Sequence, residues 1–340
     1  MAVQVYINGV DYFLPERRLT NEMISQMHPE WSIEKISAKT GIYSRPIADE
    51  NEFASDLGTN AAIRLIEKNA IEKDAIDFIL FCTQSPDYFL PTTACTIQTR
   101  LGISKMSGAI DYNLGCSGFV YGLGLAKGMI QSQQAKSILL ITAETYSKFI
   151  HQKDKSNKTI FGDAGAAAII TDRPTSNLNG EILDFVYYTD GSGFDKLIVR
   201  NGGIKYKKEI GVDIYDRENI FVKNDDYLYM DGKAIFDFTS FVVPPLIDKV
   251  LEKNILFRED IDLFVFHQAN EFMLETVRKR CKIPVEKFYI HLKDCGNTVS
   301  STIPIALTEA QNQGHLKQGM KVLIAGFGVG LSVAVTILQY

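Results

Sequence analysis

The sequence is poor in the features that mark a disulfide-bonded, metal-bound or membrane-spanning protein. It has five cysteines in 340 residues, and no two of them form a Cys-x-x-Cys pair, so neither a disulfide framework nor a zinc ribbon is expected. No apolar stretch approaches the roughly 18 residues that span a bilayer. The first segment, MAVQVYINGVDYFLPERRLT, lacks the basic and apolar regions of a signal peptide. These absences predict a cytoplasmic protein with reduced thiols.

The sequence also lacks a large excess of charge of one sign. Lys and Arg number 36 against 41 Asp and Glu, and no long basic run occurs, so no nucleic-acid groove or membrane-surface patch is expected. The five histidines have no His or Glu partner at a metal-site spacing, which predicts no metal site. What the chain does have is 46% hydrophobic residues, enough for a substantial globular core.

An internal repeat organises the chain. LIEKNAIEKDAIDFILF (65–81) aligns without a gap with VLEKNILFREDIDLFVF (250–266), and each predicts a helix end, a polar loop and a buried strand. Cys82 follows the first strand and His267 the second. Residues 112–144 and 293–328 repeat the order turn, helix, strand, with Asn297 near the place of Cys116.

The repeat predicts two fused α/β halves, residues 1–172 and 178–340, joined by the turn-rich TDRPTSNLNG (171–180). Apolar strands alternating with helices predict mixed sheets covered by helices on both faces. Related halves bring equivalent strand ends together, so we expect Cys116, His267 and Asn297 to lie near one another.

Cys116, in DYNLGCSGFVYGLGLA, has two interpretations. It is either a small core residue at a crowded turn or a nucleophile at the start of a helix. Gly115 permits a sharp strand-to-helix turn, and the positive end of the helix favours a thiolate. The apolar flanks oppose ionisation, so activation requires a base nearby.

His267 and Asn297 also have structural alternatives. His267 follows the apolar run LFVF, where it could cap a carbonyl group, but ligands of α/β sheets bind beyond such strand ends. Asn297 could cap a helix, or its amide could donate to an oxyanion. A nucleophilic thiol, a neutral histidine and a neutral amide together suit acylation of the thiol, followed by stabilisation of an enolate formed by loss of CO₂.

These residues lie in motifs that resemble one family, the β-ketoacyl-acyl carrier protein synthases III. The similarity covers nearly the whole chain, in YINGVDYFLPERRLTN, KTGIYSR, FCTQSPDYFLPTTACTIQTRLG, GCSGFVYGL, IFGDAGAAAII, DGSG, FHQAN, GNTVSSTIPIAL and GFGVG. The resemblance implies a thiolase-like, five-layered αβαβα fold and a homodimer. It implies a catalytic triad of Cys116, His267 and Asn297, with the backbone amides of Cys116 and Val329 as the oxyanion hole.

The resemblance also implies the reaction and its partners. Cys116 takes an acyl group from an acyl-CoA, and decarboxylation of a malonyl-thioester on acyl carrier protein supplies the carbon nucleophile. Further positions match by motif: Trp31, Lys39, Lys155, Gly232, Phe236 and Asn270 for coenzyme A and substrate, and Leu90 for the acyl pocket of the partner subunit. Arg278, Lys279 and Arg280 form a basic patch for the carrier protein, or simply a solvated helix face.

The sequence departs from the family pattern at four places. Lysine stands at 39 and at 155 where the family has arginine, which changes a planar fork into a point charge. Val329 replaces a glycine, and about twenty extra residues occur near 202–223. Fatty-acid initiation and a specialised lipid or secondary-metabolite pathway therefore both stay open. So do transfer of the acyl group to an amine or hydroxyl, a type III polyketide synthase, and a non-catalytic subunit that binds acyl carrier protein.

Overall fold

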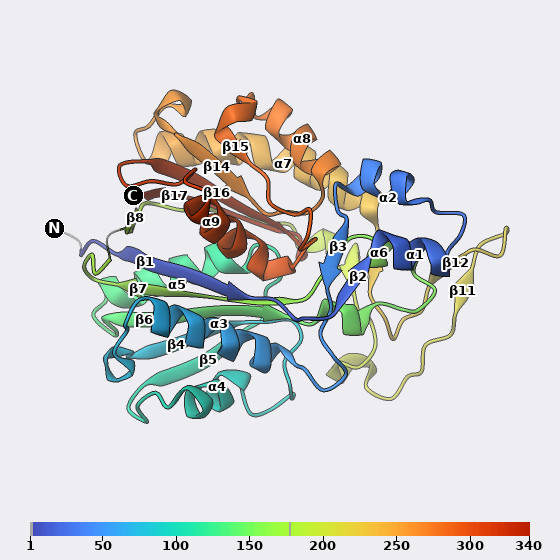
Figure 1. Cartoon of the computed structure of the whole chain (residues 1–340), viewed down its shortest axis with the longest axis horizontal. Helices are drawn as coiled ribbons and strands as arrows, with labels where there is room; N and C mark the ends of the chain where they lie inside the picture. The colour runs from blue at the N-terminus through green and yellow to red at the C-terminus, as the bar shows by residue number, and fades with distance from the viewer. Residues whose placement is uncertain (1–2, 177) are drawn as a thin grey trace.

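The computed structural model describes residues 3–176 and 178–340. The first two residues of the predicted N-terminal half, and residue 177 of the predicted connection, lie outside the described residues. Layers of helix and sheet form the body, and a smaller lobe extends from one end (Figure 1).

The helices are α1 (Asn21–Met27), α2 (Ile33–Thr40), α3 (Ala54–Lys68), α4 (Thr93–Leu101), α5 (Gly118–Gln131), α6 (Lys155–Lys158), α7 (Gly232–Lys253), α8 (Glu271–Arg280) and α9 (Thr302–Asn312). The longer strands are β1 (Tyr6–Phe13), β4 (Phe78–Cys82), β5 (Gly108–Tyr112), β6 (Ser137–Glu144), β7 (Ala164–Thr171), β9 (Val186–Thr189), β14 (Leu263–Phe266), β16 (Lys321–Gly328) and β17 (Ser332–Gln339). The short ones are β2 (Arg18–Thr20), β3 (Ser44–Pro46), β8 (Gly180–Ile182), β10 (Leu197–Ile198), β11 (Ile214–Tyr215), β12 (Phe221–Lys223), β13 (Tyr229–Met230) and β15 (Phe288–Tyr289).

The strand pairing repeats along the chain. β5, β4 and β6 are parallel neighbours and β7 pairs antiparallel with β6, while β15, β14 and β16 are parallel and β17 pairs antiparallel with β16. The short strand β8 pairs with both β1 and β17 and so joins the two sets into one hydrogen-bonded sheet. This pattern confirms the predicted α/β fold with mixed sheets built from duplicated halves.

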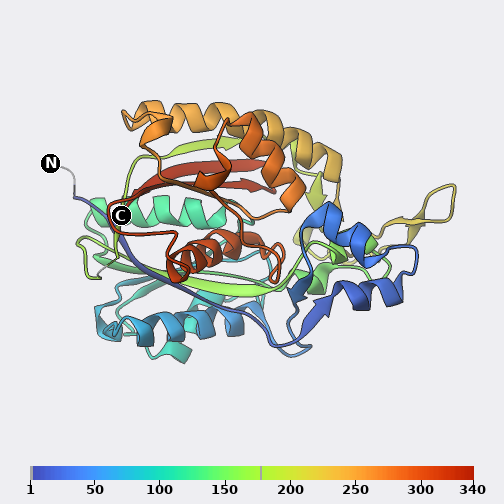
Figure 2. The ribbon, with the colours of Figure 1, turned by 45° about the horizontal axis from the view of Figure 1, so that its top comes forward.

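Alternation along the strands produces the layers. In β4, Ile79 and Phe81 face the core under α3 and α4, whereas Leu80 faces the core that contains α5 and α9. In β14, Val265 faces that same central core, and Phe264 faces the core under α7 and α8. Because the strands are buried on both faces, their sequences are continuously apolar. Helices α5 and α9 therefore lie between the two halves of the sheet, with helices outside each (Figure 2).

The smaller lobe is built from α1, α2, α6 and the predicted insertion. The insertion forms an antiparallel hairpin of β11 and β12 that projects beyond the body (Figure 1). Arg45 ties the lobe to the body: its side chain is fully buried and donates to Asn21 Oδ1 at 2.6 Å and, through Nε, to the Thr159 carbonyl oxygen at 3.0 Å. The lobe is thereby fixed beside the loop that precedes β7.

Candidate active site

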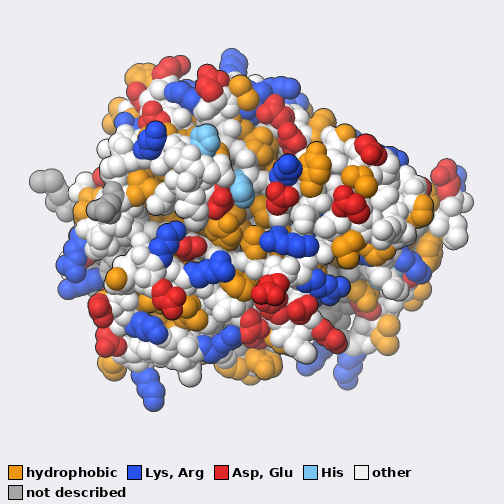
Figure 3. Space-filling view, viewed as in Figure 1, with side chains coloured by type: hydrophobic (Ala, Val, Ile, Leu, Met, Phe, Trp, Pro, Cys, Tyr) orange, Lys and Arg blue, Asp and Glu red, His pale blue; other side chains and the backbone are white. Residues whose placement is uncertain are grey.

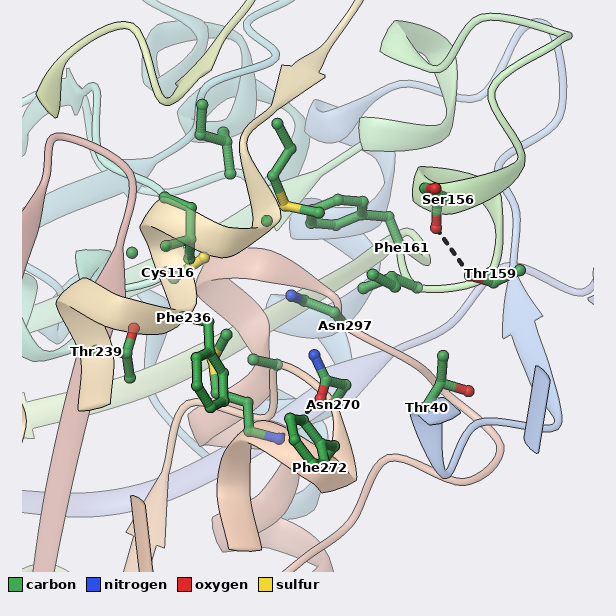
Figure 4. A pocket seen from close by; sticks show the side chains of 18 of the residues that line it. Thr40, Cys116, Ser156, Thr159, Phe161, Phe236, Thr239, Asn270, Phe272 and Asn297 are labelled. Atoms are coloured by element: carbon green, nitrogen blue, oxygen red, sulfur yellow. Dashed lines mark hydrogen bonds between the residues drawn. The ribbon is translucent and has the colours of Figure 1, made fainter. Parts of the chain in front are cut away.

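One cavity of about 460 Å³ collects side chains from both halves of the chain. Cys116, His267 and Asn297 all line it, which fulfils the expectation that the strand ends converge. Cys116, Asn297 and Asn270 come from different elements and lie around the same space (Figure 4). Of the positions predicted for coenzyme A and substrate, Trp31, Lys39, Gly232, Phe236 and Asn270 line the cavity.

Cys116 lies between the end of β5 and the start of α5, and only 6% of its surface is exposed. Burial, together with the nearby Glu144 carboxyl, raises the pKa of its thiol to about 12. The backbone amides of Cys116 and Val329 hydrogen-bond to the sulfur and oppose that rise in pKa. Both amide N–H groups thus point at one spot beside the sulfur. With this pKa the thiol is neutral at pH 7.

The turn before Cys116 has room only for glycine. A side chain at Gly115 would lie against Gln84 Oε1 and Val329 Cγ1, and one at Gly328 would lie against the Cys116 side chain. The strand that ends at Gly328 can therefore approach the sulfur closely, and it brings the Val329 amide with it. Val329 in place of glycine retains its backbone amide, so this departure from the family pattern keeps the donor.

His267 follows β14 and is held by a chain of hydrogen bonds. Its Nδ1 lies 2.7 Å from Thr302 Oγ1, and that hydroxyl donates to the Val299 carbonyl oxygen at 3.1 Å. A hydroxyl has one proton to donate, so this network assigns the proton of the neutral ring to Nδ1 and leaves Nε2 with a lone pair. Burial lowers the pKa of His267 to about 3, so the ring is neutral at pH 7.

Asn297 presents its amide group to that lone pair. Its Oδ1 accepts a hydrogen bond from the Val299 backbone amide at 2.9 Å, which turns Nδ2 toward His267 Nε2 at 3.5 Å. Its own backbone is anchored to the loop before β7, because Asn297 donates to the Ile160 carbonyl and accepts from the Gly162 amide. The Asn297 amide is therefore a rigid donor on the cavity side of the histidine.

Thr302 and Glu144 were not singled out from the sequence. Thr302 lies in the same motif as Asn297, GNTVSSTIPIAL, and that proximity was the available signal. The Glu144 carboxyl, at the end of β6, is fully buried and accepts hydrogen bonds from the Gln84 amide, Ser85 Oγ and Ser300 Oγ. The sequence around it carries no motif that would mark it.

The buried Glu144 carboxyl predicts a specific dependence of stability on pH. Burial raises its pKa from 4.5 to about 8, so between these values the folded chain retains a proton that the unfolded chain has lost. The free energy of unfolding must therefore fall as pH rises, by up to about 1.4 kcal/mol per pH unit. Two other buried groups titrate nearby. Burial raises the pKa of Asp163 from 3.8 to about 6, which adds a small fall in stability, and it lowers the pKa of His267 from 6.5 to about 3, which opposes the fall near pH 6.5 because the unfolded imidazole still binds a proton there.

We therefore expect the melting temperature to drop by roughly 2 °C from pH 6.5 to pH 8 in the wild type, given about 2.1 cal/mol/K of unfolding entropy per residue. The Glu144→Gln variant should lose most of this drop, since its side chain cannot ionise. Glu50→Gln, at an exposed carboxyl, is the matched control and should melt like the wild type. Parallel melting curves for wild type and Glu144→Gln across this range would contradict a neutral Glu144.

Lysines surround the mouth of the cavity. Lys35 and Lys39 place their ammonium groups 5.8 and 5.6 Å from the Trp31 ring centre. Lys155 does not line the cavity; it forms an ion pair with Glu30, next to Trp31. Acidic and basic side chains are mixed over the face seen in Figure 3. The positive charge is thus local to the Trp31 side of the mouth.

Deeper in the cavity, the predicted contacts come from the starts of α7 and α8. Phe236, on α7, stacks on Phe272 with ring centres 5.5 Å apart. Asn270 caps α8, because its Oδ1 accepts from the Met273 amide at 2.9 Å. Its Nδ2 is the remaining polar group of that side chain and is left for a ligand.

Two of the predicted regions, the Leu90 loop and the basic patch, lie away from this cavity. Leu90 is 82% exposed and follows Tyr88 and Phe89, which are also exposed. In the predicted basic patch, Arg278 donates to both carboxylate oxygens of Glu275, and Arg280 packs over the Phe241 ring at 4.5 Å. Lys279 lies 3.9 Å from the same Glu275 carboxylate. Part of the charge of this patch is therefore already neutralised within α8.

Neither a metal cluster nor a membrane span was found in the part of the chain that the structure describes. Residues 3–176 and 178–340 contain no group of three or more His, Cys, Asp or Glu side chains placed to hold a metal ion. Within these same ranges, no helix is both long and apolar enough to cross a membrane.

Comparison with known proteins gives one consistent result. Residues 110–191 match the family model for 3-oxoacyl-[acyl-carrier-protein] synthase III, and residues 251–340 match the model for its C-terminal part. Beta-ketoacyl-[acyl-carrier-protein] synthase III of Oleidesulfovibrio alaskensis is 34% identical, with 100% of both chains covered. The enzyme of the same name from Syntrophomonas wolfei is 36% identical over 99% of this chain and 98% of its own. A crystal structure of a 3-oxoacyl-(acyl-carrier-protein) synthase III has 44% identity and a TM-score of 0.95, and covers 99% of this chain and 100% of its own.

Proposed function

Because the chain belongs to the β-ketoacyl-acyl carrier protein synthase III family, we propose that it condenses an acyl-CoA with a malonyl-thioester carried by acyl carrier protein, with loss of CO₂. The observation that carries the proposal is the single cavity lined by a thiol, a neutral imidazole with an assigned tautomer, and an oriented amide. The reaction requires no metal or other cofactor, since coenzyme A and carrier-protein thioesters are themselves the substrates.

In the first half-reaction, Cys116 becomes acylated. His267 Nε2 takes the proton of the thiol as the sulfur attacks the carbonyl carbon of acyl-CoA, which avoids a free thiolate in a site that raises the thiol pKa. The amides of Cys116 and Val329 stabilise the negative oxygen of the tetrahedral intermediate. The bond to coenzyme A then breaks, and the proton held on His267 leaves with the coenzyme A sulfur.

In the second half-reaction, the malonyl-thioester loses CO₂. Its thioester oxygen accepts hydrogen bonds from Asn297 Nδ2 and from His267 Nε2–H, and both stabilise the enolate as the carboxylate carbon–carbon bond breaks. The enolate carbon attacks the acyl-Cys116 carbonyl, the carbon–sulfur bond breaks, and the departing Cys116 thiolate takes a proton from solvent, which is the one proton that the overall reaction consumes. In this step the proton of the neutral His267 ring is on Nε2, and Nδ1 has the lone pair. Thr302 supports this tautomer when its hydroxyl turns to donate to Nδ1.

The remaining positions fit the same substrates. Trp31 and Lys39 offer a ring and a charge to the nucleotide of coenzyme A, with Lys155 reaching it after exchange of its Glu30 partner. Gly232, Phe236 and Asn270 line the pantetheine arm. Arg278, Lys279 and Arg280 offer a weak basic surface for acyl carrier protein. We further propose a cytoplasmic homodimer in which the exposed Leu90 loop of each subunit closes the acyl pocket of its partner.

The pathway follows from the same substrates. The names of the full-length relatives support initiation of fatty-acid synthesis, in which a short acyl-CoA is the first acceptor. The hairpin near 202–223 and the two lysine replacements leave a specialised lipid or secondary-metabolite pathway as the alternative. Both pathways use one chemistry, so the reaction can be tested before the pathway is known.

The test is acylation from a panel of acyl-CoAs, followed by addition of one acceptor at a time: malonyl-acyl carrier protein, malonyl-CoA, an amine or an alcohol. Intact-mass spectrometry should show an acyl adduct that disappears with malonyl-acyl carrier protein and yields a β-ketoacyl product. An adduct that ignores malonyl-thioesters and passes to the amine or alcohol would establish an acyltransferase instead. Failure of every acyl-CoA to form an adduct would favour a non-catalytic subunit.

Thr302 gives a prediction for the histidine tautomer. In Thr302→Val, Nδ1 loses its partner, so we expect kcat to fall about tenfold, the value of one net hydrogen bond, with little change in KM for acyl-CoA. Thr302→Ser should restore kcat because the hydroxyl returns. The matched control is Thr298→Val, in the same buried loop, whose hydroxyl has no hydrogen-bond partner among the described residues. A rise in KM alone, or no rescue by serine, would count against positioning by Thr302.

A further inference from the structure

A second cavity, of about 240 Å³, adjoins the first beyond Cys116. Leu197 lines both cavities, and Val329, whose amide reaches the Cys116 sulfur, lines the second. When the Cys116 and Val329 amides hold the carbonyl oxygen of an acyl group, the rest of the acyl chain can extend in two directions. It can lie back along the entrance, or it can lie in this second cavity. The entrance is needed for the incoming malonyl-thioester, so the second cavity is the place for the acyl chain.

One wall of this cavity is apolar and the other carries a chain of hydrogen bonds. The apolar wall is formed by Phe149, Leu197, Ile198, Val199, Leu228 and Val329. On the polar wall, Tyr146 Oη donates to Gln84 Oε1 at 2.6 Å, and Gln84 Nε2 donates to Asn113 Oδ1 at 3.0 Å. Gln84 Oε1 also lies where a side chain on Gly115 would be, so this wall begins one residue from the nucleophile.

The polar wall still has capacity to bind another oxygen atom. Gln84 Nε2 carries two protons, and among the described residues only Asn113 accepts one of them. The Tyr146 oxygen donates its proton to Gln84 and retains lone pairs that can accept. A hydroxyl group between them could donate to Tyr146 and accept from Gln84, and a ketone oxygen could accept from Gln84. A methylene group in that place would contact only these polar atoms and could not hydrogen-bond to them.

We propose that the acyl group accepted by Cys116 is short and bears a neutral oxygen, as a hydroxyacyl or oxoacyl group, which the Tyr146–Gln84 pair recognises. The inference rests on the proposed function, because it assumes an acyl-Cys116 intermediate. The oxygen is neutral because none of the side chains that line the cavity is charged, and a carboxylate there would have no cation to pair with. The chain is short because the volume holds roughly eight water-sized groups.

The experiment compares acyl-CoAs of equal length. Rates of acylation of Cys116 by butyryl-CoA, 3-hydroxybutyryl-CoA, 4-hydroxybutyryl-CoA and acetoacetyl-CoA are followed by intact mass, with acetyl-CoA as the minimal acyl donor. At least one oxygen-bearing donor should exceed butyryl-CoA in kcat/KM by about tenfold or more, which corresponds to one good hydrogen bond. Tyr146→Phe and Gln84→Leu should each lower this ratio by about tenfold, mainly by accelerating the reaction of butyryl-CoA.

Tyr6→Phe is the control, because among the described residues its phenol donates to exposed Gln4 Oε1, and Tyr6 does not line the second cavity; the ratio should stay at the wild-type value. Butyryl-CoA or acetyl-CoA reacting fastest in the wild type, with ratios that Tyr146→Phe and Gln84→Leu do not change, would overturn the recognition while leaving the proposed function intact. If none of the donors forms an adduct, the proposed function itself fails. If one variant does not fold, the kcat/KM ratio of the wild type and that of the other variant still test the proposal.

Discussion

Cys116→Ala is expected to form no acyl adduct with any acyl-CoA and to lose at least about four orders of magnitude in condensation rate. The reason is that the Cys116 and Val329 amides both hydrogen-bond to this sulfur, so in the proposed reaction they hold the acyl carbonyl where the sulfur attacks it. Removal of a covalent nucleophile leaves only binding and oxyanion stabilisation, which cannot carry a two-step reaction. The measurement is intact mass after incubation with acyl-CoA, with product formation measured in parallel.

The control for this variant is Cys82→Ala. Cys82 is also buried, lies close to the same turn and donates to the Leu114 carbonyl oxygen, but it does not line the cavity. Burial and the nearby Glu144 raise the pKa of its thiol as they do for Cys116, but a Cys82 sulfur outside the cavity cannot meet an acyl-CoA bound there. We expect Cys82→Ala to acylate at the wild-type stoichiometry. An adduct that persists in Cys116→Ala, or disappears only in Cys82→Ala, would move the nucleophile elsewhere.

Asn297→Ala should separate the two half-reactions. In the proposed mechanism the Asn297 amide donates to the thioester oxygen as the enolate forms, so its loss should slow decarboxylation by about 10²- to 10³-fold. Acylation should persist in part, since the Cys116 and Val329 amides and His267 Nε2 are retained. Carbon dioxide release from malonyl-acyl carrier protein and the rate of adduct formation are measured separately on the same preparation.

His267→Ala extends this test. It should also abolish decarboxylation, but acylation should fall further than in Asn297→Ala, because the base that accepts the thiol proton is gone. If Asn297→Ala lowered the rates of acylation and of decarboxylation equally, the amide would not act on decarboxylation in particular but would maintain the structure of the whole site. In that case Asn297 would be a structural residue of the loop that it anchors at Ile160 and Gly162.

The opposite shifts of the two pKa values explain why the thiol and the histidine must act together. Burial raises the pKa of Cys116 to about 12 and lowers that of His267 to about 3, so a resting thiolate–imidazolium pair is strongly disfavoured. Proton transfer therefore accompanies attack rather than preceding it. After His267 has passed this proton to the coenzyme A sulfur the ring is neutral again, and its Nε2–H tautomer can donate to a thioester oxygen without supplying a proton to the enolate carbon.

The architecture and the residues of the site were predictable from the sequence for a physical reason. Strands buried on both faces have continuous apolar sequences, so DFILF and DLFVF stood out, and their repetition predicted two related halves. The residue after each such strand then had to lie at the edge of a sheet. The structure places His267 there, and it places Asn297 within reach of its ring.

Other features depend on side-chain geometry that sequence spacing does not give. Gln84 and Tyr146 are 62 residues apart, and nothing in their local sequences indicates that they share a hydrogen bond. The ion pair of Lys155 with Glu30 is set by how the smaller lobe packs, and the coenzyme A contact of Lys155 stays a prediction. The segment near 202–223 was predicted as an insertion, but its projecting hairpin was not. The boundaries at residues 172 and 178 stay a prediction.

The proposed reaction consumes one acyl group on Cys116 for each molecule of CO₂ that leaves the malonyl-thioester. The most direct measurement acylates the enzyme, removes free acyl-CoA, and then adds malonyl-acyl carrier protein labelled in its free carboxyl group. We predict that the adduct maps to the peptide containing Cys116, that it is lost at the rate at which label is released, and that the two amounts are equal. Label release without loss of the adduct, or loss of the adduct without label release, would contradict the account.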